Sequence, residues 1–260
     1  MNNADPAQIV TLTHPAAHVA LITLNSPPAN TLSRAVRERI IEITAGLHRD
    51  PEIRCLVLTG TGGTFTAGAD LREDMGLTGD RIDEFLTGFD GVLHALEDFR
   101  APVIAAVNGA AAGGGLELAL ACDIRIATAG AFFIASGVNV GLIASFWRLA
   151  RVVGLGPAKE ILLTGDRYPA ERALRWGLVT EVHPPGELLP AALAKARRIA
   201  SRPPLSVEAA KACAALAPGL TREQAAALQA EKFHAMVATD DHREAVDAFL
   251  SGRAGRYRRR

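Results

Sequence analysis

The sequence predicts a mixed α/β fold, and two observations carry that prediction. Short apolar runs at 53–58 and 102–107 are typical of strands, and the second is so apolar that both of its faces must be covered. Segments 33–48 and 80–99, which precede them, repeat apolar residues at helical spacing. After residue 200 the strand pattern stops and only helical segments follow.

The chain opens with an expected β-hairpin. Residues 9–25 contain two extended runs rich in Val, Ile, Leu and Thr, separated by His14, Pro15 and two alanines. Pro27, Pro28 and Asn30 are turn residues that end the hairpin.

Two amphipathic helices follow. In 33–48 the apolar positions are Val36, Ile40, Ile43 and Leu47, and Ser33 is a candidate N-cap. In 80–99 the apolar stripe consists of Ile82, Phe85, Leu86, Phe89, Val92, Leu93 and Leu96.

The most unusual segment is 108–123, NGAAAGGGLELALACD, between the strand at 102–107 and a further expected strand at 123–127. It passes from a strand end through three adjacent glycines into residues that favour a helix. We therefore expect a helix that begins at these glycines.

Helices are expected at 201–217, 221–239 and 242–250. We predict a core domain at 1–200 and a helical region at 201–260. The basic tail, which contains Arg253, Arg256 and the arginines at 258–260, is expected to be a solvated terminus.

Composition favours a small-molecule partner. The 260 residues hold 28 Lys+Arg and 28 Asp+Glu, and this zero net charge argues against nucleic acid or an anionic membrane as a partner. Cys55, Cys122 and Cys213 are an odd, widely spaced set, which favours a reducing cytoplasm over a disulfide framework. We expect neither a signal peptide nor a membrane span, because no apolar run approaches about 18 residues.

Several common motifs are excluded. GTGGTF at 60–65 has Phe65 where a dinucleotide fingerprint needs its third glycine, and no phosphate-loop GK[ST], GxSxG or HExxH occurs. The seven histidines lack metal-ligand spacing. We expect no metal and no tightly bound cofactor.

Two separated segments can instead present backbone N–H groups to one anion. In TFTAGADLRED, Gly68 allows a sharp turn that frees the amide of Ala69, and the helix expected at Gly114 begins with unpaired amides. Two such N–H groups aimed at one point would stabilise a thioester oxygen as it becomes an enolate, which is an oxyanion hole. Simple close packing is the alternative explanation for the glycines.

Glu117 lies three residues beyond Gly114, about one turn into this helix. Its ordinary explanation is an early glutamate favoured by the helix dipole. The neighbouring Leu116, Leu118 and Leu120 indicate a buried helix, where a lone carboxylate is costly and is usually paired or functional. Glu117 is therefore the candidate acid/base.

These segments resemble the crotonase superfamily, the enoyl-CoA hydratase/isomerase family. The likeness runs from IVTLTHPAAHVALITLNSPPANTLS through FTAGADL, APVIAAVNGAAAGGGLELALACDIRIAT and LLTGDRYPAERALRWGLVTEV to EAVDAFLSGR. It implies a spiral of ββα units and a C-terminal helical region that forms homotrimers or dimers of trimers. It also implies that Ala69 and Gly114 form the oxyanion hole. The other substrate-binding or coenzyme A-binding residues that it implies are Ala67, Gly68, Asp70, Leu71, Arg72, Gly113 and Gly137.

The resemblance fails at one catalytic position. Hydratases of this family carry a second glutamate twenty residues after the first, and here that position is Gly137. The count of twenty is in register with the family's pattern, because that pattern also has its counterparts of Asp123, the Phe132–Phe133 pair and Gly141 at these positions. The next stretch carries Phe146 and Trp147 in place of a turn rich in proline and glycine, which predicts a remodelled acyl site. Alternatively, Gly137 only meets a turn requirement.

The resemblance therefore implies an acyl-CoA enzyme with one acid/base, nominally a hydratase of 2-enoyl-CoA. Isomerisation, decarboxylation, hydrolysis and a non-catalytic acyl-CoA-binding oligomer stay open as alternatives. Coenzyme A enters only as part of the substrate.

Overall fold

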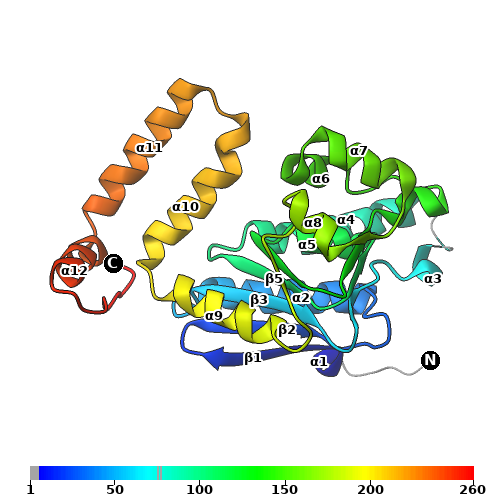
Figure 1. Cartoon of the computed structure of the whole chain (residues 1–260), viewed down its shortest axis with the longest axis horizontal. Helices are drawn as coiled ribbons and strands as arrows, with labels where there is room; N and C mark the ends of the chain where they lie inside the picture. Colours follow the sequence, from blue (N-terminus) through cyan, green and yellow to red (C-terminus); the bar gives the residue numbers. More distant parts are fainter. Residues whose placement is uncertain (1–5, 75, 77) are drawn as a thin grey trace.

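The computed structural model describes residues 6–74, 76 and 78–260, and its core consists of two sheets with helices packed around them (Figure 1). The larger sheet has the strand order β1-β2-β3-β5-β7-β10, and the smaller one β4-β6-β8-β9. The larger sheet comprises β1 (Val10–Ala16), β2 (Val19–Leu24), β3 (Cys55–Gly60), β5 (Val103–Val107), β7 (Ile124–Thr128) and β10 (Glu181–His183). The smaller one comprises β4 (Thr64–Thr66), β6 (Ala110–Ala112), β8 (Phe132–Ile134) and β9 (Tyr168–Pro169).

The chain repeats a ββα unit. After the antiparallel β1–β2 hairpin, the first strand of each unit joins the larger sheet in parallel, and the second joins the smaller sheet, also in parallel. In register, Ile104 of β5 faces Ile124 of β7, while Ala111 of β6 faces Phe133 of β8. The expected hairpin and spiral of ββα units are thus confirmed.

Helices follow the strand pairs. The helices of the core are α1 (Pro6–Ile9), α2 (Arg34–Arg49), α3 (Leu71–Asp74), α4 (Asp80–Glu97), α5 (Gly114–Leu120), the 3₁₀-helix η1 (Ser136–Val140), α6 (Phe146–Val153), α7 (Leu155–Thr164), α8 (Ala170–Arg175) and α9 (Leu188–Ala200). The remaining helices are α10 (Pro204–Leu216), the 3₁₀-helix η2 (Ala217–Gly219), α11 (Arg222–Val237) and α12 (Asp240–Leu250). Ser33 does precede α2, but its side chain makes no capping hydrogen bond. Among the described residues, no helix combines the length and the apolar character that a bilayer crossing needs.

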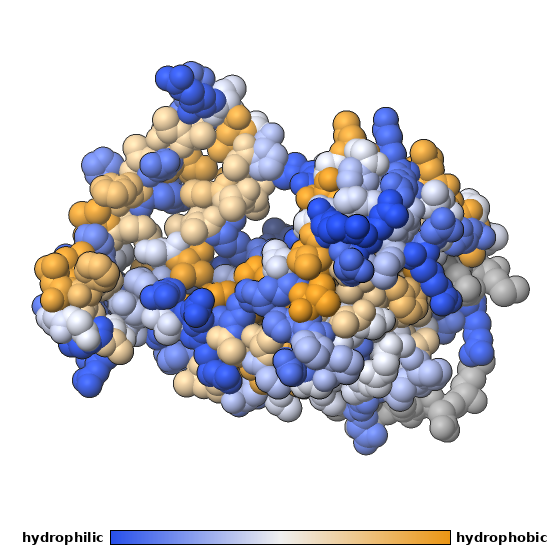
Figure 2. Space-filling view, in the orientation of Figure 1, coloured by the Kyte–Doolittle hydropathy of each residue, from blue (hydrophilic) through white to orange (hydrophobic). Residues whose placement is uncertain are grey.

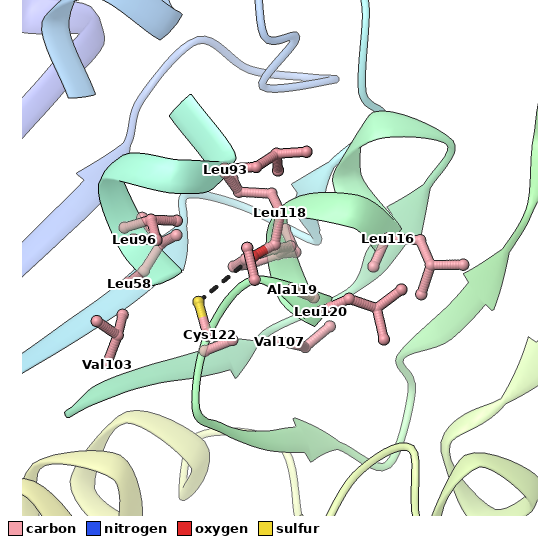
Figure 3. Packing of buried hydrophobic residues seen from close by; sticks show 14 of the residues in the cluster. Leu58, Leu93, Leu96, Val103, Val107, Leu116, Leu118, Ala119, Leu120 and Cys122 are labelled. Atoms are coloured by element: carbon pink, nitrogen blue, oxygen red, sulfur yellow. Dashed lines mark hydrogen bonds between the residues drawn. The ribbon is translucent and has the colours of Figure 1, made fainter. Parts of the chain in front are cut away.

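The core lies on both faces of the larger sheet. On one face, α2, α4 and α5 bury a cluster that includes Leu96, Leu116 and Leu118 (Figure 3). There the Cys122 thiol donates to the Leu118 carbonyl oxygen over 3.4 Å, and burial raises the pKa of Cys122 to about 12. On the other face, α9 packs its alanines, among them Ala192, against β3 and β5. Helix α5 is therefore held in the interior.

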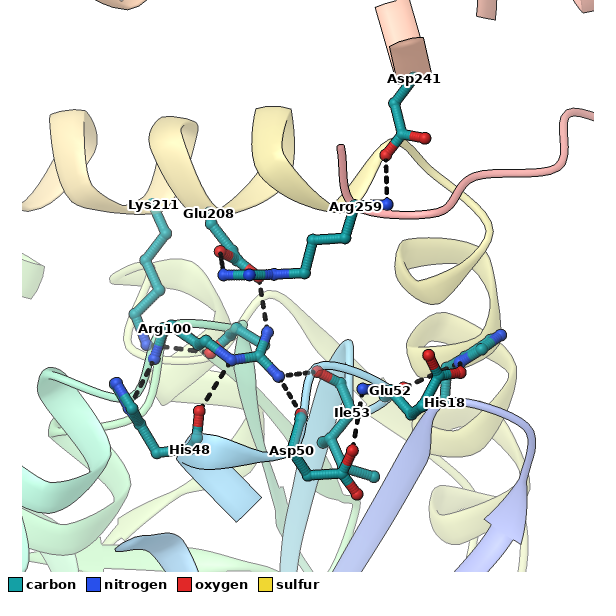
Figure 4. Close-up of polar contacts among 11 residues, drawn as sticks. His18, His48, Asp50, Glu52, Ile53, Arg100, Glu208, Lys211, Asp241 and Arg259 are labelled. Carbon is teal, nitrogen blue, oxygen red and sulfur yellow. Dashed lines mark hydrogen bonds and ion pairs between the residues drawn. The ribbon is translucent and has the colours of Figure 1, made fainter. Parts of the chain in front are cut away.

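Helices α10 to α12 project from the core as an arm (Figure 1), which Figure 2 shows carrying hydrophobic side chains on its surface. Ion pairs tie α10 to the core (Figure 4). Glu208 accepts from Arg100 at 2.6 Å and from Arg259 at 2.8 Å, while Lys211 lies 2.8 Å from Asp123. The division at residue 200 falls at the end of α9 and stays a prediction.

The basic tail is exposed at Arg253, Arg256, Arg258 and Arg260, as expected of a solvated terminus, but it also contacts acidic side chains. Arg253 pairs with Glu244 and Asp247, and the backbone N–H groups of Arg258 and Arg259 donate to Asp241 at 2.7 and 2.8 Å. Acidic residues of α12 neutralise the tail and hold it against the arm. Its charge pattern is explained by this local packing.

Candidate active site

A cavity of about 980 Å³ opens where the second strands of the ββα units end and their helices begin. Its volume is more than twice that of a cavity of about 450 Å³ at α10 and α11. Its wall combines the loop at 26–31, the loop at 67–72, the start of α5, one face of α4 and the segment 136–148. Every element that the resemblance implicated thus meets at one place.

Gly68 brings two of these segments into direct contact. Its φ is +89°, a left-handed conformation that side chains disfavour. A Cβ atom on Gly68 would lie 2.6 Å from the Gly114 nitrogen and 2.6 Å from the Ala112 carbonyl oxygen. Only glycine therefore allows the 67–69 loop to reach the N-terminus of α5.

The amides of Ala69 and Gly114 lie side by side and are available. A Cβ atom on Gly114 would be 3.4 Å from the Ala69 nitrogen. Within the described part of the chain, neither N–H donates a hydrogen bond, although both neighbours do, Gly68 to Thr66 Oγ1 and Gly113 to Ile134 O. Both Ala69 and Gly114 line the cavity. The arrangement fits an oxyanion hole at a helix N-terminus.

The loop that carries Ala69 is fixed from behind. The Ala67 N–H donates to Ala29 O at 2.9 Å, and Gly68 O accepts from the Leu32 N–H at 2.8 Å. Asn30, which is buried with a φ of +48°, donates its side-chain amide to Thr64 O at 2.8 Å. The residues after the hairpin therefore hold the 67–69 loop in place, in addition to forming the turn that the sequence predicts there.

Glu117 reaches the same cavity from the first turn of α5, as its fourth residue. It is 8% exposed, and both carboxylate oxygens face donors. Oε1 accepts a short hydrogen bond from the Ser145 N–H, and Oε2 lies 3.5 Å from Nη1 of Arg148. Ser145 holds this position in a left-handed conformation, with φ +64° and a buried hydroxyl that has no partner among the described residues.

Arg148 is itself fixed by Glu97. Its Nε and Nη2 donate to the two carboxylate oxygens of Glu97 at 2.7 and 2.9 Å, a bidentate pair. These hydrogen bonds raise the pKa of Arg148, so its charge is secure. Sequence reasoning missed Arg148, Glu97 and Ser145, because they lie on other elements than Glu117 and only the fold brings them together.

Gly137 lines the cavity in η1 and carries no acid/base group. A Cβ atom there would lie 2.9 Å from Leu142 O and 3.4 Å from the Ala144 nitrogen, while Gly137 O accepts from the Leu142 N–H at 2.8 Å. The close approach of 142–144 supports the view that this glycine meets a turn requirement. Two residues further along η1, the side-chain amide of Asn139 donates to Gly165 O at 2.8 Å.

Most other predicted residues line the cavity as well. Ala67, Asp70, Arg72 and Gly113 do so. Gly68 does not line the cavity; it brings the 67–69 loop into contact with the start of α5. The side chain of Leu71 is outside the described residues. The identity of the binding residues stays a prediction.

An apolar wall faces Glu117. Helix α4 and the segment that leads into α6 supply large side chains that remain partly exposed because they border the cavity: Ile82, Phe85, Leu86, Phe89, Val140, Leu142, Ile143, Phe146 and Trp147. This wall could cover a hydrophobic group bound next to the carboxylate.

Known proteins of one family match this chain along most of its length. Residues 15–260 match the family model for enoyl-CoA hydratase/isomerase. The chain is 37% identical over 244 residues to the crotonyl-CoA hydratase of Syntrophomonas wolfei, covering 92% of this chain and 94% of the relative. It is 38% identical over 246 residues to the (E)-benzylidenesuccinyl-CoA hydratase of Thauera aromatica, covering 93% and 96%.

A solved structure matches along almost the whole length. The enoyl-CoA hydratase from Bacillus anthracis superimposes with a TM-score of 0.94 at 32% identity, covering 97% of this chain and 100% of that one. The chain therefore belongs to the enoyl-CoA hydratase/isomerase family, within the crotonase superfamily.

Proposed function

We propose that the protein acts on an acyl-CoA thioester and that its reaction is the hydration of a 2-enoyl-CoA. The observation that carries the proposal is the convergence of the Ala69 and Gly114 amides, both without acceptors among the described residues, beside Glu117 in one cavity. The relatives named as hydratases support the same reaction type.

One carboxylate suffices for this reaction when it returns the proton that it takes. Glu117 accepts a proton from water while the water oxygen bonds to C3 of the substrate. The electron pair of the C2–C3 double bond moves toward the thioester oxygen, which becomes an enolate held by the two N–H groups. Collapse of the enolate then lets C2 take the proton back from Glu117, so atoms and charge balance.

Isomerisation is the second candidate, and Gly137 favours it. Without a second carboxylate to hold water, Glu117 would remove a proton from one substrate carbon and return it to another, through the same stabilised oxyanion. A non-catalytic acyl-CoA-binding protein is the outcome that remains if neither reaction occurs.

A product analysis separates these functions. The protein is incubated in deuterated water with 2-enoyl-CoAs of increasing chain length, and the products are identified by mass spectrometry. Hydration adds one heavy water to the acyl group, whereas isomerisation moves the double bond without that addition. Chromatographic separation of the 2- and 3-enoyl products detects the moved double bond even when Glu117 returns the same proton. Tight acyl-CoA binding without either change would overturn the enzymatic proposal.

Glu117→Gln tests the assigned acid/base. It keeps the shape of the side chain and its contact with Ser145, and removes the proton acceptor. Turnover should fall by roughly 10²–10⁴ while acyl-CoA affinity changes little. An unchanged rate would remove Glu117 from the mechanism.

We also propose that the protein works as a homotrimer or a dimer of trimers. The support is the arm of α10–α12, which extends from the core and leaves apolar side chains exposed, with Phe249 85% and Leu250 78% accessible.

A further inference from the structure

Three charged side chains from three helices form a connected series: Glu117 in α5 and Arg148 in α6 line the cavity, and Glu97 at the end of α4 lies behind the lining. Glu97 holds Arg148 by two hydrogen bonds of 2.7 and 2.9 Å. Arg148 in turn presents Nη1 to Glu117 at 3.5 Å, and its side chain is 14% exposed. Arg148 and Glu117 are thus largely withdrawn from water, and charges interact more strongly in such a site than in bulk water.

We propose that Arg148, fixed by Glu97, is a positioning residue that orients the Glu117 carboxylate and supplies the positive charge beside it. This inference rests on the proposed role of Glu117. It adds which side chains hold that carboxylate in place.

The geometry gives the two oxygens of Glu117 separate donors. The Ser145 N–H binds Oε1 and the Arg148 guanidinium faces Oε2. Each donor fixes one oxygen, so the carboxylate of Glu117 is held in one orientation. The bidentate hold by Glu97 fixes the plane of the guanidinium, so Arg148 approaches Glu117 with one defined nitrogen.

The helices and strands that pack against α5 determine which other charged side chains lie near Glu117. Helix α4 contributes Glu97 and also Asp90, which acts on Arg148 and lines the cavity. Strands β4 and β6, which also pack against α5, consist of Thr64–Thr66 and Ala110–Ala112 and carry no ionisable side chain. Arg148 is the cation that this group of acidic side chains shares within the described part of the wall. Its removal should therefore have a large effect.

Substitutions at the two ends of the pair should act in opposite directions. Arg148→Met removes the cation, so the acidic limb of the pH profile of kcat/KM should move to higher pH. Glu97→Gln keeps a side chain that can hold Arg148 but removes a competing negative charge, so the limb should move to lower pH. Arg148→Lys retains the charge without the planar fork and should move the limb less than Arg148→Met does.

A double variant separates this role from simple structural support. Arg148→Met alone strands Glu97 and should lower the melting temperature. Glu97→Gln combined with Arg148→Met should recover part of that loss but keep the limb shifted to higher pH. The matched control is Arg172→Met, because Arg172 also pairs with a glutamate, Glu160 at 2.8 Å, but lies outside the cavity wall. It should leave the profile unchanged.

A direct readout makes the test independent of turnover. In protein labelled with ¹³C at glutamate carboxyl carbons, the Glu117 signal, assigned by its absence in Glu117→Gln, is titrated in each variant. Its midpoint should follow the same opposite shifts. Equal midpoints in wild type and Arg148→Met, or shifts of the same sign in Arg148→Met and Glu97→Gln, would overturn the inference. Failure of all acyl-CoA turnover would instead count against the proposed function.

Discussion

At the scale of single residues, the candidate site depends on a glycine that no other residue can replace. Gly68 combines a φ of +89° with backbone atoms of Ala112 and Gly114 at 2.6 Å from a Cβ position. Neither backbone segment can move without displacing β6 or the start of α5. The spacing of the two amides is therefore built into this contact.

We predict that Gly68→Ala disables the oxyanion hole. The left-handed conformation alone costs an alanine about 1–2 kcal/mol, and the added methyl group pushes the Gly114 nitrogen away. The rate should fall by roughly 10²–10³, the usual loss for one oxyanion donor, and the melting temperature should drop. Turnover of a 2-enoyl-CoA and thermal unfolding measure the two effects.

Gly46→Ala is the matched control. A Cβ atom on Gly46 has no neighbour within 4 Å, and the residue lies inside α2, where alanine is favoured by roughly 0.5–1 kcal/mol. This variant should be at least as stable as the wild type and equally active. If Gly68→Ala behaved in the same way, the proposed contact between the two segments would be wrong.

Single residues also mark what the sequence could and could not predict. Backbone donors leave a sequence signature, because glycines at Gly68 and Gly114 and a carboxylate one turn later form a local pattern. Arg148 and Glu97 leave none, since they stand 31 and 20 positions away from Glu117 and meet it only through the packing of α4, α5 and α6. The close approach of Leu142 O to Gly137 likewise has no signature in the sequence, because it comes from the fold of the segment that follows η1.

At the scale of elements, α4 divides its apolar stripe between two tasks. Toward its C-terminus, Val92, Leu93 and Leu96 are buried in the core. Toward its N-terminus, Ile82 and Leu86 are 43% and 53% exposed and line the cavity. Periodicity predicts the whole stripe correctly as one face of a helix, but it cannot tell core from cavity, because both select large apolar side chains.

We predict that substitutions in the two halves of α4 have separable effects. Leu96→Ala removes a fully buried side chain and should destabilise the fold by about 2–5 kcal/mol. Leu86→Asn should change the free energy of unfolding by less than about 0.5 kcal/mol, because the side chain is already half exposed.

For acyl-CoA binding, the order of the two variants should be reversed, with the larger effect at Leu86. Leu86→Asn should weaken binding of long apolar acyl-CoAs several-fold and leave short ones nearly unchanged, because only a long acyl chain would reach the wall. Isothermal titration with a chain-length series and denaturant unfolding measure both quantities. Equal loss for short and long acyl groups would show that α4 does not contact the acyl chain.

At the scale of the whole molecule, charged hydrogen bonds hold the C-terminal tail against the arm. Glu244 of α12 accepts from Arg253 at 2.7 and 2.9 Å and from the Arg256 N–H at 2.8 Å. Hydrogen bonds from the Arg253 side chain first, and from the Arg256 backbone second, lower the pKa of Glu244 from 4.5 to about 2. Docking of the tail therefore depends on an ionised Glu244.

We predict that acid releases the tail. Since the folded-state pKa is depressed, the stabilisation is fully present above about pH 4.5 and is lost as the pH falls toward about 2. Hydrogen exchange at the Arg256 amide, corrected for intrinsic rates, should accelerate across this window, whereas exchange at Val246 within α12 should not. Glu244→Ala, which removes the acceptor, should expose the Arg256 amide already at neutral pH. A protected Arg256 amide in that variant would contradict the assignment.

The arm also presents an apolar surface that a single chain leaves uncovered. Phe233 of α11 is 66% exposed, and Phe249 and Leu250 of α12 are more exposed still. We predict that the wild type sediments at three or six times the mass of one chain, because association would bury these side chains. Phe249→Asp combined with Leu250→Asp should sediment as monomers with an unchanged circular dichroism spectrum. Leu174→Asp, which places the same charge at a partly exposed leucine of α8, should leave the association state as it is. A monomeric wild type, or a double variant that still associates, would show that the arm does not hold the subunits together.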